Sequence, residues 1–214
     1  MNCCQTQTLS GTDKFFTKQS NRYLKQFRKK GLAKEQRMLV EGISASGIEG
    51  KSILEIGCGV GGLHLSMLKQ GASFATGIDI SEGMLNGAKR LSHELGFEQN
   101  TNYLLGDVVQ MNGVVPEADI VVLDKVVCCY ENIHELLKKS SDKSKQVYAF
   151  TYPNPNIFVH ISFKGLILLG TIFKWVFRPY WHDWDEIIRV VEQEGFRQTY
   201  KNSTLMWQVR VLER

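Results

Sequence analysis

The 214-residue chain contains little proline, no strong net charge and no long apolar run free of charged residues. Its four prolines stand against nineteen glycines, a ratio that indicates regular structure joined by tight turns. Hydrophobic residues make up 43% of the chain and charged residues 22%, which excludes a disordered or fibrous protein. The length suits one domain.

Cysteine is also scarce. The five cysteines are Cys3, Cys4, Cys58, Cys128 and Cys129. Their number is odd, four of them form adjacent pairs, and the chain is too large for a disulfide scaffold, so they favour a reducing cytoplasm. Residues 1–13 are polar and lack the apolar core of a signal peptide. Adjacent cysteines rarely bind one ion together, because paired ligands are usually roughly two to four residues apart. We therefore predict buried, inert thiols and no metal site, with substrate-facing thiols and metalloid ligands as alternatives.

Positive charge is concentrated near the amino terminus. Residues 14–37 carry nine Lys or Arg and one Glu, a local charge of +8, so the rest of the chain sums to −4. After an expected loose tail over 1–12, the apolar spacing predicts helices over 15–30 and 32–43. We interpret this basic arm as a solvated helix face. An RNA-docking surface and a membrane contact are the alternatives.

Strand-like and helix-like segments alternate through the remaining chain. Strands are expected at 52–56, 72–80, 102–105, 118–123 and 146–151, with two more within 196–213, and helices at 63–70, 81–95, 131–140 and 183–194. This alternation, with an apolar strand at 118–123, predicts an α/β fold: a mostly parallel sheet with helices on both faces. The closing strand pair adds an antiparallel edge.

Residues 157–177 form the most apolar segment, with 14 apolar residues of 21. His160, Lys164 and Lys174 argue against a transmembrane helix. We prefer a roof over a hydrophobic substrate pocket, with Phe163 and Leu166 facing the ligand. Core packing against the amino-terminal helices is an alternative.

A third interpretation of 157–177 is an interfacial membrane helix. The basic arm would support it, and so would Trp175, Trp181 and Trp184.

The spacing Gly57-x-Gly59-x-x-Gly62 follows an expected strand and precedes an expected helix, as in nucleotide-binding loops. NAD and S-adenosylmethionine both suit such a loop. Glu55 separates them, because a carboxylate there would repel a pyrophosphate but attract an ammonium and a sulfonium. Asp79 and Asp107 end the next two strands, where carboxylates accept hydrogen bonds from ribose hydroxyls and the adenine amino group. We therefore favour S-adenosylmethionine.

The segment Leu54-Glu55-Ile56-Gly57-Cys58-Gly59-Val60-Gly61 resembles the first motif of class I S-adenosylmethionine-dependent methyltransferases. Asp79, Gly106-Asp107 and the stretch 118–124 resemble the motifs that follow it, and the resemblance covers about residues 50–151. It implies a Rossmann-like seven-stranded sheet of order 3-2-1-4-5-7-6 with an antiparallel last strand.

The resemblance also implies which residues hold the cofactor. They are Glu55, Gly57, Cys58, Gly59, Gly61, Asp79, Ile80, Asp107, Val108 and Leu123. The sequence identifies no catalytic residue, since methyl transfer from a sulfonium depends mainly on alignment and needs a base only for a protonated acceptor. The polar groups considered for substrate contact are Tyr130, Tyr152, His160, His182 and Asp183.

We predict one methyltransferase domain over 1–214: a helical arm (1–49), a cofactor-binding core (50–151), and substrate-covering helices with the final strand pair (152–214). The expected acceptor is a small hydrophobic or ring-containing molecule, by weak resemblance to quinone C-methyltransferases and the magnesium-protoporphyrin O-methyltransferase. DNA is not expected, because the Asn/Asp-Pro-Pro-aromatic motif of amino-methylating DNA enzymes is absent. An RNA or protein methyltransferase docking through the arm, and an inactive cofactor-binding subunit, are the alternatives.

We expect a cytoplasmic protein with peripheral membrane contact through 14–37 and 157–177. The oligomeric state is left open.

Overall fold

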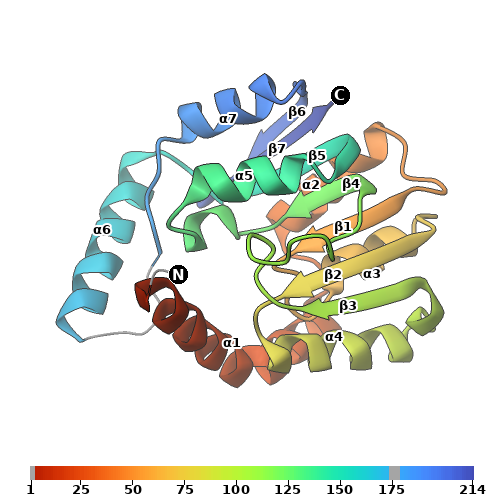
Figure 1. Cartoon of the computed structure of the whole chain (residues 1–214), viewed down its shortest axis with the longest axis horizontal. Helices are drawn as coiled ribbons and strands as arrows, with labels where there is room; N and C mark the ends of the chain where they lie inside the picture. Colours follow the sequence, from red (N-terminus) through yellow and green to blue (C-terminus); the bar gives the residue numbers. More distant parts are fainter. Residues whose placement is uncertain (1–2, 174–178) are drawn as a thin grey trace.

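A seven-stranded sheet lies at the centre of the molecule, in a computed structural model that describes residues 3–173 and 179–214, with backbone alone for 3–10. Its strands are β1 (Ser52–Ile56), β2 (Phe74–Asp79), β3 (Thr101–Leu105), β4 (Ala118–Leu123), β5 (Ser144–Pro153), β6 (Arg197–Ser203) and β7 (Trp207–Glu213). The order is β3-β2-β1-β4-β5-β7-β6 (Figure 1). Strands β1 to β5 pair in parallel, and β7 is antiparallel to both β5 and β6. The predicted fold class, strand order and antiparallel last strand are confirmed.

Helices cover both faces of the sheet. They are α1 (Cys3–Lys30), α2 (Lys34–Ala45), α3 (Gly62–Leu68), α4 (Glu82–Glu94), α5 (Ile133–Ser141), α6 (Ile157–Ile172) and α7 (Trp184–Gln193), with 3-10 turns at Glu98–Asn100 and Val127–Cys129. One core cluster packs α5, α6 and α7 on one face, and a second packs helices α1 to α4 on the other (Figure 1). Apart from Asp119, β4 is apolar, and the two clusters explain why: from Ile120 onward its successive side chains enter opposite cores.

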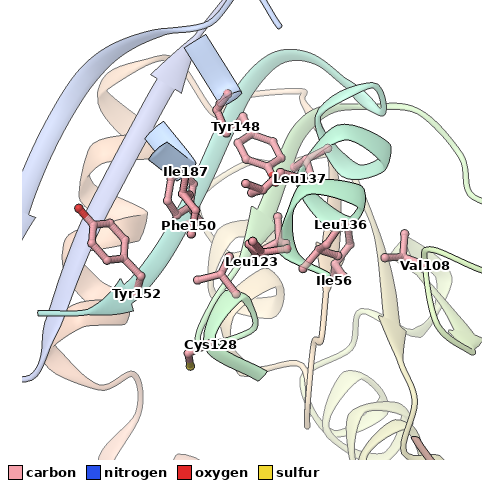
Figure 2. Packing of buried hydrophobic residues seen from close by; sticks show 14 of the residues in the cluster. Ile56, Val108, Leu123, Cys128, Leu136, Leu137, Tyr148, Phe150, Tyr152 and Ile187 are labelled. Atoms are coloured by element: carbon pink, nitrogen blue, oxygen red, sulfur yellow. The ribbon is translucent and has the colours of Figure 1, made fainter. Parts of the chain in front are cut away.

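The core under α5 and α7 is rich in aromatic side chains. Tyr148, Phe150 and Tyr152 follow one another along one face of β5 and are almost fully buried (Figure 2). Leu136 and Leu137 of α5 close over the same sheet (Figure 2). This packing fixes the carboxyl end of β5 next to α7.

The amino-terminal helix is longer than predicted. The expected loose tail is wrong for residues 3–12, which belong to α1, and residues 1–2 lie outside the described part of the chain. Small residues on α1 allow close packing on α4: Thr17 Oγ1 lies 2.8 Å from Ser81 Oγ, and a Cβ at Gly83 would lie 2.7 Å from Thr17 Cγ2. A buried face made of small polar groups carries little hydrophobic signal, so the sequence pattern concealed it.

The apolar segment folds into the 16-residue helix α6. Only Val159, Phe163 and Gly170 are buried in it. No helix in the described residues is both long and apolar enough to cross a membrane. The expectations that fell on Lys174, Trp175 and the end of the segment lie outside the described residues.

Candidate cofactor-binding site

The loop between β1 and α3 requires glycine for two physical reasons. Gly57 has a φ of +67°, and a Cβ there would lie 2.4 Å from Val126 Cγ2. At Gly62 a Cβ would lie 2.5 Å from the Phe27 ring of α1. The first glycine therefore permits the turn, and the last permits α1 to pack over the loop.

A cavity of about 310 Å³ lies beside this loop, at the carboxyl ends of the first four strands. Eight of the ten predicted cofactor residues line it; Gly61 and Leu123 do not. Five carboxylate side chains contribute to the lining, those of Glu55, Asp79, Asp107, Asp124 and Glu131. Among the described lining residues Lys125 is the one Lys or Arg, and its Nζ lies 2.5 Å from Glu35 Oε1 of α2. The cavity is therefore strongly acidic.

Asp79, at the end of β2, holds the loop in place. Its Oδ2 accepts a hydrogen bond of 2.8 Å from Gly59 N, and its Oδ1 accepts one of 2.8 Å from Ser81 N. Burial raises the pKa of Asp79 to about 6, although these two backbone donors oppose the rise. Each carboxylate oxygen keeps a lone pair for a ligand hydroxyl.

Glu55 has a partner that the sequence did not reveal. His64 Nδ1 lies 2.6 Å from Glu55 Oε2, and His64 Nε2 lies 3.1 Å from the Tyr103 hydroxyl. Burial raises the pKa of Glu55, and the contact with His64 lowers it. His64 therefore occupies Glu55 Oε2, the carboxylate that was expected to attract an ammonium.

Asp107, after β3, accepts from a residue beyond β4. The Tyr130 hydroxyl donates to Asp107 Oδ2 at 2.8 Å and also lies 3.0 Å from Oδ1. Burial raises the pKa of Tyr130, and the hydrogen bond to Asp107 adds to the rise. Tyr130 is thus a neutral donor that orients the carboxylate predicted to meet adenine.

Helices α1 and α2 cover the other side of the cavity, which the sequence did not predict. Phe16, Tyr23 and Phe27 of α1 line it. Gln36 Nε2 of α2 donates to Asp124 Oδ2 at 2.8 Å, which ties α2 to the end of β4. The apolar spacing of residues 15–30 predicted a helix with one buried side, but it did not show that this side would cover the cavity.

The roof predicted over 157–177 is wrong for this cavity. No described residue of α6 lines it. Phe163 packs edge-on against Trp181, with ring centroids 5.5 Å apart, and Leu166 is 39% exposed to solvent. The helix lies beyond β5, too far along the sheet edge to cover the glycine loop (Figure 1).

The cysteines divide between core and cavity. Cys128 is buried in the core, whereas Cys58 and Cys129 line the cavity. Burial raises the pKa of Cys58, and the contact with the Cys128 thiol, together with burial, raises the pKa of Cys129. These thiols are protonated at neutral pH, so they are poor nucleophiles. Within the described residues no group of three or more His, Cys, Asp or Glu could hold a metal ion; the side chains of Cys3 and Cys4 lie outside that description.

The remaining polar residues considered for substrate contact lie elsewhere. Tyr130 lines the acidic cavity, but Tyr152, His160, His182 and Asp183 gather around a second cavity.

The acidic cavity suits a cationic cofactor better than a dinucleotide. A pyrophosphate would meet five carboxylates, whereas an ammonium and a sulfonium would be attracted by them. The open space at Gly59, where a Cβ would meet nothing within 4 Å, lies in the same lining. The residues present therefore fit S-adenosylmethionine, and Asp79 and Asp107, which are predicted to meet ribose and adenine, both line the cavity.

Comparison with known proteins agrees with the motifs. Residues 53–146 match the model of a methyltransferase-domain family. The chain is 30% identical over 158 residues to the ubiquinone biosynthesis O-methyltransferase of Pasteurella multocida, covering 69% of this chain and 64% of that protein. It is 25% identical over 129 residues to cycloartenol-C-24-methyltransferase of Arabidopsis thaliana, covering 56% and 38%. The chain thus spans less than two thirds of the length of these relatives.

A solved structure extends the likeness over nearly the whole fold. The magnesium protoporphyrin IX methyltransferase of Synechocystis PCC 6803, solved with bound SAH, superposes with a TM-score of 0.72 at 19% identity, covering 97% of this chain and 99% of that one. Motifs, fold and family match agree, and the chain belongs to the class I S-adenosylmethionine-dependent methyltransferase superfamily.

Proposed function

We propose that this protein binds S-adenosylmethionine in the acidic cavity and transfers its methyl group to a small hydrophobic or ring-containing molecule. The observation that carries the proposal is the charge of the cavity, with five carboxylates and one lysine around a glycine loop. The bound cofactor would supply an electrophilic methyl group, which an aligned acceptor displaces directly.

The chemical class of the methyl acceptor is inferred from the side chains of α1 that line the cavity. Phe16, Tyr23 and Phe27 of α1 face the loop, and Cys129 and Tyr180 lie among the lining residues. This aromatic and apolar side of the cavity, across from the carboxylates, favours a flat or hydrophobic ligand. The names of the similar proteins refer to ubiquinone biosynthesis, cycloartenol and magnesium protoporphyrin IX, and these compounds are ring-containing and largely hydrophobic.

The chain's own residues would exclude water and hold the geometry. The Gln36–Asp124 hydrogen bond and the Lys125–Glu35 ion pair close α2 over the end of β4. Lys125 has a φ of +60°, a conformation that costs free energy for a residue with a Cβ, and its backbone N–H donates to Thr151 Oγ1 at 2.8 Å. Contacts with α2 and β5 hold Lys125 in this conformation.

The experiment is to incubate the protein with methyl-labelled S-adenosylmethionine and a native metabolite extract, then to separate small molecules, RNA and protein. We expect label in an organic-extractable small molecule, together with release of S-adenosylhomocysteine. Label in RNA or protein would contradict the acceptor class. Cofactor binding without S-adenosylhomocysteine from any extract would indicate an inactive subunit.

A second proposal concerns binding to a membrane surface. It rests on an exposed apolar face of α6 and an exposed basic face of α1. The outer face of α6 is apolar: Ile157, Phe158, Ile161, Leu168, Leu169 and Ile172 are 46–73% exposed and lie opposite the buried stripe. On α1 a basic stripe is exposed, formed by Lys14, Lys18, Arg22, Lys25 and Lys29, and within the described residues it makes no ion pair. We propose that α6 lies on an anionic bilayer, with the basic stripe adding attraction.

Sedimentation with vesicles tests the membrane proposal. Wild-type protein should pellet with phosphatidylcholine vesicles containing phosphatidylserine, and less with phosphatidylcholine alone or at high salt. The pair Ile161→Asp and Leu168→Asp should abolish pelleting, whereas Thr171→Asp, exposed on another side of α6, should not. Equal pelleting of all variants, or a stable dimer in solution that binds no vesicles, would contradict it.

A further inference from the structure

A second cavity, of about 370 Å³, lies at the carboxyl end of β5, where β7 begins. It shares no lining residue with the acidic cavity. A wall separates the two: Tyr180 N donates to Cys128 O at 2.7 Å, and His182 Nε2 lies 2.9 Å from Tyr130 O. The methyl-transfer site described above therefore does not explain this cavity.

Arg210 of β7 is buried at this cavity, where the Tyr152 hydroxyl and the charge of Asp185 act on it from nearby. It is 5% exposed, and within the described residues no carboxylate lies within ion-pair distance of it. Its Nη1 donates to Gln208 Oε1 at 2.9 Å and to Val209 O at 3.0 Å, but its Nε has no hydrogen-bond partner. A buried guanidinium with an unused donor is costly unless a ligand accepts from it.

Trp184 supplies a second unused donor. Its side chain is 5% exposed, and its indole Nε1 also lacks a hydrogen-bond partner in the described part of the chain. Both side chains contact Tyr152: the Arg210 guanidinium lies 5.2 Å from the Tyr152 ring centroid, and the Trp184 ring stacks on it at 5.2 Å. Figure 2 shows Tyr152 at this end of β5. Indole and guanidinium groups donate and cannot accept, so an occupant must bring acceptor oxygens.

The walls determine the shape of the occupant. Trp181 contacts His160, with ring centroids 4.4 Å apart, and His182 contacts Trp184 at 5.7 Å. Aromatic walls on several sides favour a planar ligand.

The charged residues that line the second cavity disfavour a ligand with two negative charges. Asp183, Asp185 and Lys201 line the cavity and are all exposed. Two aspartates would repel a dianion such as phosphate more strongly than a single carboxylate.

We propose that the second cavity binds a planar aromatic carboxylate, whose oxygens accept hydrogen bonds from Arg210 Nε and Trp184 Nε1 while its ring lies among Tyr152, Trp181 and His160. Four of the five polar residues that the sequence suggested for substrate contact line this site. The proposal stands independently of the methyl acceptor.

The test uses the full chain without cofactor and follows the indole N–H signals of the four tryptophans by NMR, with the Trp184 signal assigned through Trp184→Phe. The probe is 2-naphthoate, and uncharged 2-naphthamide and inorganic phosphate are the controls. We expect naphthoate to shift the Trp184 signal, and neither control to do so at the same concentration. Equal shifts with naphthamide or phosphate would overturn the assignment of an aromatic carboxylate.

Variants separate ligand binding from a structural role. Arg210→Met should weaken naphthoate binding at least tenfold, while the melting temperature of the free protein stays the same or rises, because an unpaired buried charge is removed. Arg189→Met, exposed on α7, should change neither quantity. If Arg210→Met lowers the melting temperature and leaves naphthoate binding intact, Arg210 is structural and the proposal fails. Saturating S-adenosylmethionine should not displace naphthoate; displacement would place the probe in the acidic cavity and overturn the proposal.

Discussion

The two cavities lie along the same edge of the sheet, yet their charge and construction are opposite. The acidic cavity gathers five carboxylates around a glycine loop, whereas the second cavity has a buried arginine among aromatic rings. The first is built largely from residues that directly follow strands β1 to β4. The second is assembled from the end of β5, from α6, from the start of α7 and from the last two strands.

This contrast explains what the sequence could reveal. Glu55, the glycine loop, Asp79 and Asp107 occur at fixed distances after apolar strands, and parallel strands bring their carboxyl ends together. Their meeting in one cavity was therefore predictable. Arg210 lies in an alternating strand where an arginine usually points to solvent, and only the packing of Tyr152 and Trp184 buries it.

Substituting the first glycine of the loop should have the largest effect on the acidic cavity. Gly57→Ala combines a φ of +67° with a 2.4 Å approach to Val126, so we expect no measurable cofactor binding and a loss of at least about 2 kcal/mol in the free energy of unfolding. Gly47→Ala is the matched control, because its φ is +86° but no atom lies within 4 Å of the added Cβ. Calorimetry and chemical unfolding measure both effects; equal behaviour of the two variants would show that the steric contact is absent.

Removing the Asp79 carboxylate should come next. Asp79→Ala loses charge-assisted hydrogen bonds to ribose, each worth roughly 1.5–3 kcal/mol, so S-adenosylmethionine affinity should fall at least tenfold. Naphthoate binding in the second cavity should stay within twofold of wild type. Titration calorimetry with both ligands checks this separation, and unchanged cofactor affinity would mean that Asp79 does not contact the ribose.

The pH dependence of stability isolates the same carboxylate. The pKa of Asp79 is about 6 in the folded protein, mainly through burial, against an ordinary value of 3.8. The folded state therefore holds the proton more tightly, and this stabilisation is complete below pH 3.8 and lost as the pH rises through 6. Relative to Asp79→Asn, the cofactor-free protein should lose about 2 kcal/mol of unfolding free energy between pH 4 and 7. Urea unfolding of both proteins measures the difference; a constant difference across this range would contradict a raised pKa.

The smallest effect is expected at Tyr130. Tyr130→Phe removes a hydrogen bond to the Asp107 carboxylate, which should lower the free energy of unfolding by about 1.5 kcal/mol. The freed carboxylate can still accept from adenine, so cofactor affinity should change less than threefold. Thermal unfolding and calorimetry provide both values, and a large loss of affinity would show that Tyr130 itself contacts the cofactor.

The interior of the fold followed more closely from sequence than its coverings did. Strand β1 was predicted to the residue, and the cap of α4 at Ser81 is present, with Ser81 Oγ accepting from Met84 N. Helix α1 and the position of α6 were misjudged, because amphipathic spacing shows that a helix has two sides but not which surface each side meets. His64 escaped notice for a related reason: its partner Glu55 becomes a neighbour only when α3 turns back over β1.

Titration calorimetry of the cofactor-free protein with S-adenosylmethionine, and with NAD under the same conditions, tests the central claim most directly. The acidic cavity predicts measurable binding of S-adenosylmethionine, accompanied by a higher melting temperature, and no binding of NAD. Tight binding of NAD with no heat from S-adenosylmethionine would contradict the account.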